Sequence, residues 1–425
     1  MTWGGQDLED RRSVPGRGRL VLALLLLAYI FNFLDRQILG ILAAPIKADL
    51  HLTDTEFGAI GGLAFALLYS ALGIPLAYLA DRTSRSGVIA GSLAVWSAFT
   101  ALCGAATGYW QLFLCRLGVG VGEAGGVAPA YALISDYFPP ERRARAMAIY
   151  SLGVPIGLAG GTLLGAYVAS LLGWRGAFVV MGAAGLILAP VLRLGVRDLP
   201  RGSAATQQAP LGQVFPLLAR KPAFWLLAFA SSASSLIGYG LALWVPSVMM
   251  RSFHLDLLTT GKFLSSLLLV GGSIGVFAGG WFADRLGTMD RSWYAKLPAI
   301  AWLLTIPTYA GGLLSPSLWI AWPLLLIANG LAILWLGPVT TAVQHLAPRP
   351  MRSTAAASFL LINNLIGLGA GPLLIGRLSD ALKQSYGADA LRNAAVACTA
   401  FYALAALLGL LAASWLRKDW LADEP

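Results

Sequence analysis

Four ionisable residues lie deep inside apolar stretches of the sequence: Asp35 and Arg36 in one stretch, Arg116 and Glu123 in another. A charge at the centre of a bilayer costs about 2.5–3.5 kcal/mol on insertion scales, so such side chains must face a wet cavity or one another. With all four ionised their charges sum to zero, and protonating one carboxylate leaves the group one unit positive. A cluster of this kind can take up a proton and hold an anion, and each event changes the other.

If the two helices line one cavity, the spacing of these residues predicts that they meet. Arg116 and Glu123 are seven residues apart, which returns a helix almost to the same face, about 10 Å further along its axis. Counted from the predicted helix ends, Arg116 lies about 10 Å deep, Glu123 about 21 Å and Asp35, on an antiparallel helix, about 18 Å. Asp35 is therefore expected to pair with Arg116 or with Arg36. The alternative is a purely structural pair of salt bridges, although buried ion pairs contribute little stability alone.

The composition is that of a polytopic membrane protein. Of 425 residues, 57% are hydrophobic and 12% charged, with a mean hydropathy of +0.71, whereas an average soluble domain has about 25% charged residues. Apolar runs recur along nearly the whole chain, which disfavours a soluble enzyme, a disordered chain and a nucleic-acid binder. The three cysteines and three histidines show no pairing or ligand spacing, so no disulfide, metal or cofactor is expected.

Breaks at glycine, proline and charged clusters divide the sequence into twelve apolar segments, each long enough for a membrane helix of roughly 20 residues. The first is too long, and lacks the small-residue cleavage site, for a cleaved signal peptide. The predicted spans are residues 20–46, 55–80, 88–106, 110–137, 143–171, 175–195, 222–250, 259–284, 294–314, 317–346, 353–381 and 391–416.

Lysine and arginine are concentrated on one side of these spans. Of the 30 basic residues, 21 lie in the two termini and the loops after even-numbered spans, seven lie on the opposite side and two lie within spans. Because cytoplasmic loops collect positive charge, both termini are expected to face the cytoplasm. This placement accounts for the net charge of +10 without a nucleic-acid partner.

The chain also contains an internal repeat. Asp81 and Arg82 end the second span, and Asp284 and Arg285 end the eighth, at the corresponding place in the second half. Two parallel six-helix halves are an architecture of alternating-access transporters. The predicted organisation is a tail at 1–19, an N-terminal bundle at 20–195, a linker at 196–221, a C-terminal bundle at 222–416 and a tail at 417–425.

These motifs resemble the signatures of the major facilitator superfamily over essentially the whole length. The loop signature Gly-x-x-x-Asp-Arg-x-Gly is complete from Gly280 to Gly287, whereas Ala77 and Ser84 replace its glycines in the first half. The fourth-span signature Arg-x-x-x-Gly-x-Gly-x-Ala is present from Arg116 to Ala124. The resemblance implies an all-α membrane fold of two pseudo-symmetric six-helix bundles. It assigns cytoplasmic gating to Asp81, Arg142, Arg145 and Asp284.

Three further segments are similar to Spinster-type lipid transporters within this superfamily. They are residues 32–38, 45–50 and 63–67. The similarity implies a multi-pass protein of a bacterial inner membrane, and we expect it to work as a monomer. An Asp-Arg pair in the first span also occurs in other symporters of the superfamily, so a proton-coupled organic-anion symporter or a drug exporter is the alternative.

The second half offers neutral hydrogen-bonding and aromatic side chains where the first half has charges. Serines between 231 and 235 suit helix packing at least as well as binding. Such a cavity, charged on one side and mostly apolar on the other, suits an amphiphile better than a small dianion. The predicted substrate-binding residues are Arg36, Arg116, Tyr239, Asn329, Phe359 and Asn363.

Two glycine runs inside the spans predict close helix packing. Gly153, Gly157 and Gly161 recur every fourth residue, a spacing that lets membrane helices approach closely. The run from Gly118 to Gly122 has no preceding strand, so close packing is a better interpretation than a nucleotide-binding loop.

The predicted function is alternating-access transport of an anionic amphiphile, such as a lysophospholipid or a sphingoid phosphate, coupled to protons. Asp35 and Glu123 are the predicted proton-linked carboxylates, Arg116 holds the headgroup, and Arg36 tunes Asp35. The expected partners are this small substrate, protons and membrane lipid. A membrane enzyme is disfavoured because the sequence offers no nucleophile, metal or phosphate-binding constellation. A static scaffold without a transport cycle is the remaining alternative.

Overall fold

The computed structural model describes residues 15–199, 211–348 and 351–421. Parts of the predicted tails and of the predicted linker lie outside these described residues. The described chain is built from helices, whose bounds are as follows. They are α2 (Pro15–Ile41), α3 (Ala43–Leu50), α4 (Asp54–Ala59), η1 (Ile60–Ala64), α5 (Phe65–Arg82), α6 (Arg85–Cys103), α7 (Tyr109–Glu123), α8 (Val127–Tyr137), α9 (Pro140–Ser151), α10 (Gly153–Gly195), α11 (Leu211–Ala219), α12 (Pro222–Ser252), α13 (Leu257–Gly287), α14 (Trp293–Leu313), α15 (Leu318–Ile333), α16 (Leu336–His345), α17 (Arg352–Tyr386), η3 (Gly387–Asp389), α18 (Ala390–Cys398) and α19 (Phe401–Asp419).

Nine helical stretches among the described residues are long and apolar enough to cross a membrane. Two of them, 141–195 and 354–419, are 55 and 66 residues long, more than twice the roughly 20 residues that one crossing needs. Each therefore holds two of the predicted spans, and α10 turns at Gly173, where φ is 70°. The remaining predicted span coincides with α14. The predicted all-α membrane fold is confirmed.

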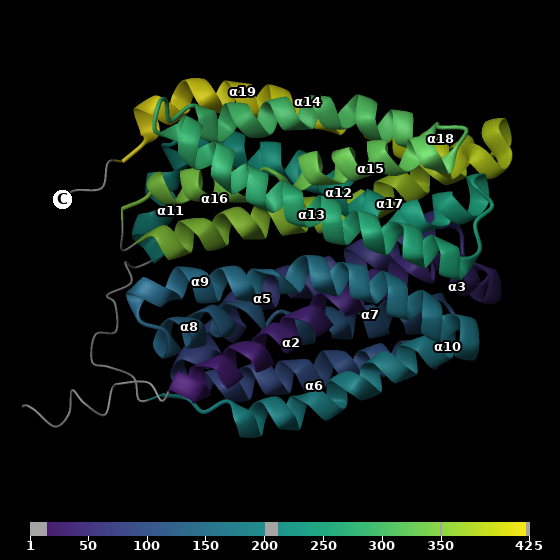
Figure 1. The fold of residues 1–425 in the computed structure, drawn as a ribbon, viewed down its shortest axis with the longest axis horizontal. Helices are drawn as coiled ribbons and strands as arrows, with labels where there is room; N and C mark the ends of the chain where they lie inside the picture. The colour runs from purple at the N-terminus through teal and green to yellow at the C-terminus, as the bar shows by residue number, and fades with distance from the viewer. Residues whose placement is uncertain (1–14, 200–210, 349–350, 422–425) are drawn as a thin grey trace, which may run out of the picture.

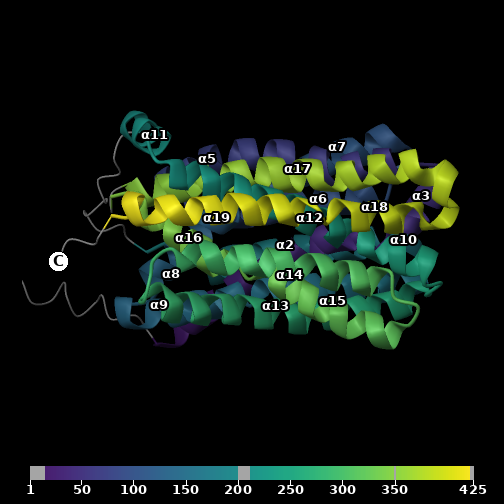
Figure 2. The ribbon, with the colours of Figure 1, turned by 90° about the horizontal axis from the view of Figure 1, so that it is seen from above.

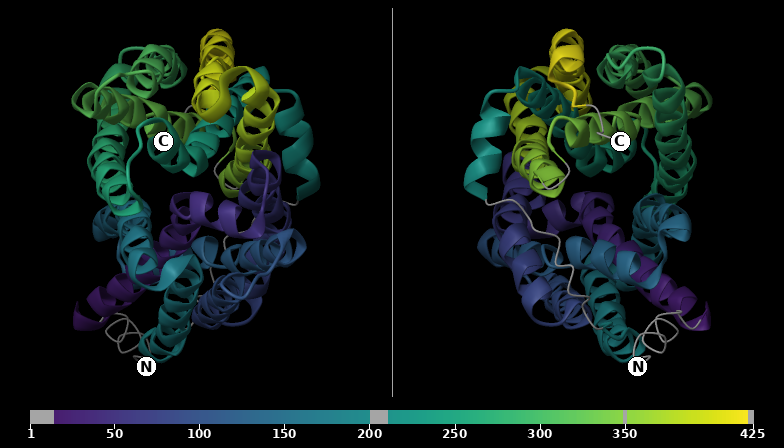
Figure 3. Two further views of the ribbon diagram at one scale, coloured as in Figure 1. Left: turned by 90° about the vertical axis from the view of Figure 1, so that its right-hand side faces the viewer. Right: turned by 90° about the vertical axis from the view of Figure 1, so that its left-hand side faces the viewer.

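The helices form two bundles that lie side by side (Figure 1). One is made of α2 to α10 and the other of α12 to α19, and a view along the helices shows the second bundle above the first (Figure 3). The first described helix begins and the last ends at the same end of the molecule (Figure 1). Helix α11, from the predicted linker, lies at that end too (Figure 2). The cytoplasmic location of this end stays a prediction from the basic residues.

Glycines bring the first, fourth and fifth spans to backbone contact. A Cβ atom added to Gly157 would lie 2.6 Å from the carbonyl oxygen of Ile30, and one added to Gly161 would lie 2.5 Å from that of Leu34. Both carbonyls belong to α2, so α10 packs directly on the helix that carries two of the candidate charges. Gly120 and Gly122 of α7 meet the backbones of α5 and α6 in the same way, whereas Gly118 packs against the ring of Phe99. The predicted close packing is confirmed.

We predict that Gly157→Val lowers the stability of the protein because its side chain would collide with α2. Overpacking of this kind typically costs about 1–3 kcal/mol. Gly160→Val is the matched control, because a Cβ there would meet nothing within 4 Å. Thermal unfolding of the purified protein in detergent checks this, and equal melting temperatures for the two variants would contradict it.

Candidate functional site

One of the candidate charges, Glu123, lies where a membrane helix is interrupted. Helix α7 ends at Glu123, and the turn that follows separates it from α8. A π-helical turn, η1, precedes Phe65 on the neighbouring span, and such turns are frequent at functional sites. The carbonyl groups that end α7 carry partial negative charge, which favours a cation beside Glu123.

Two crossed ion pairs link α2 to α7. Arg116 Nη1 donates to Asp35 Oδ2 at 3.3 Å, and Arg36 Nε donates to Glu123 Oε2 at 2.7 Å. Thr100 Oγ1, from α6, donates to the other oxygen of Asp35. The structure thus brings together the four ionisable residues selected from the sequence. Arg36, predicted to tune Asp35, is paired with Glu123 instead.

The cluster is buried, and two of its atoms lack partners. The side chains of Glu123, Arg116 and Asp35 are 0%, 2% and 5% exposed, whereas that of Arg36 is 13% exposed. Among the described residues, Arg116 Nε and Glu123 Oε1 have no hydrogen-bond partner. A buried polar atom without a partner costs about 1–3 kcal/mol. A water molecule or a substrate atom that hydrogen-bonded to Arg116 Nε, or a proton bound to Glu123 Oε1, would remove this cost.

Arg36 is the most exposed member of the cluster and is held by aromatic rings. Its guanidinium carbon lies 4.7 Å from the ring centre of Tyr69, 4.9 Å from that of Phe65 and 5.1 Å from that of Phe33. Tyr239, from the other half, lies close enough to interact with it electrostatically. An anion that enters between the halves would therefore meet Arg36 before the more deeply buried Arg116.

The other predicted binding residues of the C-terminal half are spread over different places. Asn363 is 3% exposed, and its Oδ1 has no partner among the described residues. Phe359 is buried and packs edge-on against Trp335, with ring centres 6.3 Å apart. Asn329 lines a separate cavity of the C-terminal half. Of this predicted group, Tyr239 is the residue that the structure brings to the charge cluster.

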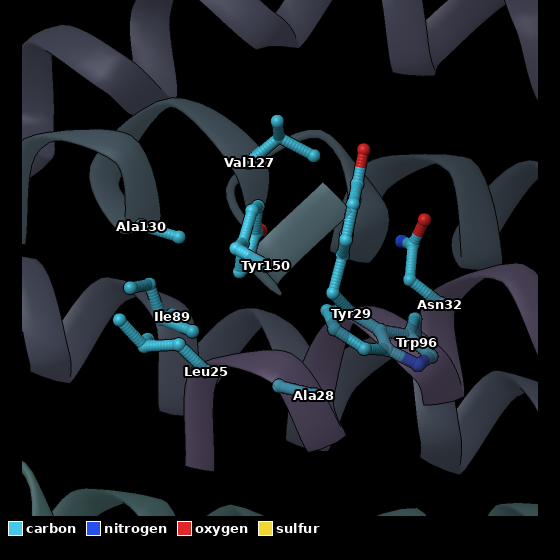
Figure 4. Close-up of a pocket in the computed structure, with 10 residues that line it drawn as sticks. Leu25, Ala28, Tyr29, Asn32, Ile89, Trp96, Val127, Ala130 and Tyr150 are labelled. Atoms are coloured by element: carbon cyan, nitrogen blue, oxygen red, sulfur yellow. The ribbon is translucent and has the colours of Figure 1, made fainter. Parts of the chain in front are cut away.

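A small cavity lies one helical turn from the charge cluster, beside Asn32 (Figure 4). Its volume of about 10 Å3 is close to what a single water molecule needs. Tyr29 stacks on Tyr150 at 4.3 Å along its wall, and Asn32 Oδ1 is a further buried atom without a partner among the described residues. The sequence analysis missed Asn32 and Tyr29. The sequence signal that could have found them is their position in an apolar span, one and two helical turns before the Asp35–Arg36 pair.

The residues assigned to gating lie at the end where the chain begins and ends. Asp81 pairs with Arg85 at 2.8 Å, and Arg85 also reaches Asp136 at 2.5 Å. Arg142, Arg145 and Asp284 are exposed, and the gating role of the four predicted residues stays a prediction.

Ser84, which replaces a glycine of the loop signature, has a contact of its own at this end. It donates to Asp198 at 2.5 Å, and Asp198 also accepts from the backbone of Ser86. Partial burial raises the pKa of Asp198, but the hydrogen bonds from Ser84 and Ser86 outweigh it and hold that pKa below its usual range. The serine that replaces a signature glycine in the first half thus bonds its loop to Asp198, in the segment that follows α10.

The opposite end of the molecule is closed by a second charge cluster, around Asp54. This carboxylate is 5% exposed and accepts two hydrogen bonds from Arg251, at 2.8 and 2.9 Å, one from Ser379 at 2.7 Å and one from Lys47. Asp380 in turn accepts hydrogen bonds from the first backbone amides of α4. The partners come from both halves, so these contacts hold the halves together at this end. The sequence analysis did not select Asp54, because the side chains that meet it come from three separate segments, α3, α12 and α17.

Glycines reinforce this closure. A Cβ added to Gly58 of α4 would lie 2.5 Å from the carbonyl oxygen of Pro372, and one added to Gly376 of α17 would lie 2.3 Å from that of Asp54. Helices α4 and α17 therefore touch through their backbones, with no space for a cargo between them.

We predict that Arg116→Leu destabilises the protein because it leaves Asp35 buried without a counter-charge. Removing one partner of a buried pair costs about 3–5 kcal/mol. The double variant Arg116→Leu/Asp35→Asn should recover most of this loss. Thermal unfolding of the three proteins measures the effect, and an Arg116→Leu protein as stable as the parent would refute the pairing.

We predict that Asp54→Asn opens the end of the molecule that Asp54 closes. Leu243→Cys is the reporter in a protein without its three native cysteines, because Leu243 is buried where α12 meets Gly40 and Gly61. A membrane-impermeant maleimide should label it roughly tenfold faster, which corresponds to about 1.4 kcal/mol. Asp49→Asn is the control, because Asp49 pairs with Arg175 within one half. Equal labelling rates in the parent and both variants would count against this closure.

The sequence profile of the Major Facilitator Superfamily matches residues 25–372. An MFS-type efflux pump of Mycolicibacterium smegmatis is 33% identical over 416 residues, which cover 97% of this chain and 96% of the pump. Protein spinster homolog 1 of Homo sapiens is 28% identical, over 88% of this chain and 75% of its own length. A crystal structure of a bacterial homolog to the human lysosomal transporter Spinster, inward-facing and unoccupied, superposes with a TM-score of 0.88 at 30% identity. It covers 96% of this chain and 99% of that one.

Proposed function

Because this chain belongs to the major facilitator superfamily and is a multi-pass membrane transporter of Spinster type, we propose that its cargo is an anionic amphiphile moved in exchange with, or together with, protons. A lysophospholipid or a sphingoid phosphate has the required chemistry. The observation that carries the proposal is the pair of crossed salt bridges, in which two carboxylates and two guanidiniums share a buried site.

In this proposal the cargo's phosphate first meets Arg36. This guanidinium is the most exposed of the cluster, whereas Arg116 is buried and already bonded to Asp35. A phosphate offers several acceptor oxygens to a planar guanidinium, so it competes directly with Glu123 for the same donors. Arg116, with its unpartnered Nε, becomes the second donor as the headgroup settles deeper.

Displacement of Glu123 by the phosphate would couple cargo to protons. A carboxylate that is fully buried and has lost its guanidinium is unstable as an anion, so it takes up a proton. Deprotonation would then restore the Arg36–Glu123 pair and expel the phosphate. Asp35 can play the same role toward Arg116, with Thr100 as an additional donor to its charged form.

The distribution of charge between the halves supports an amphiphile. The four buried charges belong to the N-terminal half, whereas the predicted residues of the other half, Tyr239, Asn329, Phe359 and Asn363, are neutral. A headgroup on one side of the cavity and an apolar chain against the other would match this asymmetry.

A second candidate is a drug exporter or a proton-coupled organic-anion symporter of the same fold. The similarity to a relative described as an efflux pump, over nearly the full length of both chains, favours the exporter. Ligand-induced thermal shifts separate these cargoes, because a ligand that binds the folded protein raises its melting temperature. Lysophospholipids, short sugar acids and cationic drugs are the three sets to compare.

We predict that Glu123→Gln abolishes the pH dependence of lysophospholipid transport in proteoliposomes. Glutamine resembles the protonated glutamate, so the cluster stays one unit positive at every pH and should still bind the anion. Glu141→Gln, which changes an exposed glutamate of α9, is the matched control and should keep the pH profile of the parent. An unchanged profile in Glu123→Gln would remove this residue from proton coupling.

A further inference from the structure

A second cavity, of about 60 Å3, lies in the C-terminal half among α12, α13, α14 and α15, and reaches α2 through Gln37. Its wall is mostly apolar, but polar groups gather at one place. Gln37, Tyr309 and Asn329 line it together, and Asn329 forms a side-chain hydrogen bond with Tyr309. The space suffices for a few water molecules or for a small polar group, and is too small for an acyl chain.

A proline kink adds a backbone acceptor to this cavity. Pro246 lies inside α12 and has no N–H, so the carbonyl of Ala242, four residues earlier, lacks its helical donor. Gln37 Nε2 donates to this oxygen at 3.4 Å from the other half. A carbonyl oxygen has two lone pairs, and this long hydrogen bond leaves one of them for another donor. Ala242 and Pro246 both line the cavity.

A buried hydroxyl group without a partner lies next to Gly238, one of the residues that line the cavity. Tyr402 is 0% exposed, and its hydroxyl has no hydrogen-bond partner among the described residues. Its ring lies parallel to that of Tyr309, with centres 6.5 Å apart. The hydroxyl is also the nearest atom, at 4.0 Å, to the place where a side chain on Gly238 would begin. Gly238 lines the cavity and has no side chain, so no side chain at that position separates the hydroxyl from the cavity.

The cavity and the charge cluster are joined by consecutive residues of α2. Arg36 points to Glu123 of α7, and Gln37, about 100° further around the helix, points to Ala242 of α12. The charge cluster and the cavity are therefore neighbours on either side of α2. A headgroup that carries a phosphate and a second polar group can reach both of them.

We propose that this cavity is a hydroxyl subsite, which binds a hydroxyl group that the cargo carries on the same headgroup as its phosphate. The hydroxyl donates to the carbonyl of Ala242 or to the amide oxygen of Asn329, and accepts from Tyr402. This inference rests on the proposed anionic amphiphile and names the second feature by which that cargo is recognised. A simple alkyl phosphate lacks this feature, whereas a glycerol or amino-alcohol phosphate has it.

Two ligands that differ by one hydroxyl test the proposal. They are 1-oleoyl-glycerol 3-phosphate and its 2-deoxy analogue, 3-oleoyloxypropyl phosphate, and their Kd values are measured on the purified full-length protein by calorimetry. The parent should bind the hydroxylated ligand about 3- to 10-fold more tightly, as for a typical net hydrogen bond. Tyr402→Phe should bind both with the affinity that the parent shows for the deoxy ligand.

The thermal stability of Tyr402→Phe distinguishes a ligand contact from a structural one. The hydroxyl has no partner in the unliganded protein, so removing it should leave the melting temperature unchanged or raise it while the preference disappears. Ser231→Ala is the matched control, because it also removes a buried hydroxyl of the C-terminal half without a described partner, but one that does not lie within 4 Å of a Cβ placed on Gly238. It should keep the full preference.

A second variant keeps the test decisive if Tyr402→Phe does not fold. Gly238→Ala places a methyl group in the gap before the hydroxyl, at a distance of 4.0 Å that is ordinary van der Waals contact, and should also reduce the preference. Equal affinities for the two ligands in the parent would overturn the subsite and leave the proposed cargo standing. Binding of neither ligand would overturn the proposed cargo, and the subsite with it.

Discussion

The structure depends on charges that the bilayer forces to find one another. Asp35, Arg36, Arg116 and Glu123 cannot face lipid, because each would lose its hydration without compensation. They can be buried only if two helices from different parts of the chain are held at hydrogen-bonding distance. The glycines of α7 and α10 allow this, because their missing side chains let α2, α5 and α6 approach at backbone contact. Packing in this half therefore supports the electrostatic arrangement.

One helical span connects the three polar regions of the molecule. Helix α2 presents Arg36 to the charge cluster and Gln37 to the C-terminal half, and its continuation α3 carries Lys47 to the cluster around Asp54. A change in the pairing of Arg36 therefore acts on an element that also contacts the other half and the closed end. Coupling between cargo, protons and opening requires such an element with contacts to each site.

The two halves have different chemistry although they repeat the same architecture. The N-terminal half carries the buried ion pairs, which in the proposed function are exchanged for contacts with a phosphate or a proton. The C-terminal half contributes neutral donors and acceptors, including the Ala242 carbonyl that Pro246 leaves free. A headgroup held between them would be recognised by charge on one side and by hydrogen bonds on the other. Neutral hydrogen bonds discriminate by geometry, since a buried group left unpaired is penalised.

Much of this protein's architecture follows from the sequence alone, because a polar side chain inside a bilayer costs free energy unless it is paired or faces a cavity. The twelve spans, the duplicated halves and the four deep charges could all be predicted from hydropathy, spacing and a few motifs. That Asp35 would pair with an arginine was also predictable, but the choice of Arg116 for Asp35 and of Arg36 for Glu123 was not, since it depends on how two helices are rotated about their axes.

The cluster around Asp54 is decided by packing alone. Its other members, Lys47, Arg251 and Ser379, are ordinary helix-end residues in the sequence, and only the tertiary structure brings them together. The unpartnered hydroxyl of Tyr402 and the cavity at Pro246 were equally invisible, because sequence patterns report which side chains are polar. They do not report which polar atoms lack a partner, which is decided by the positions of atoms hundreds of residues apart.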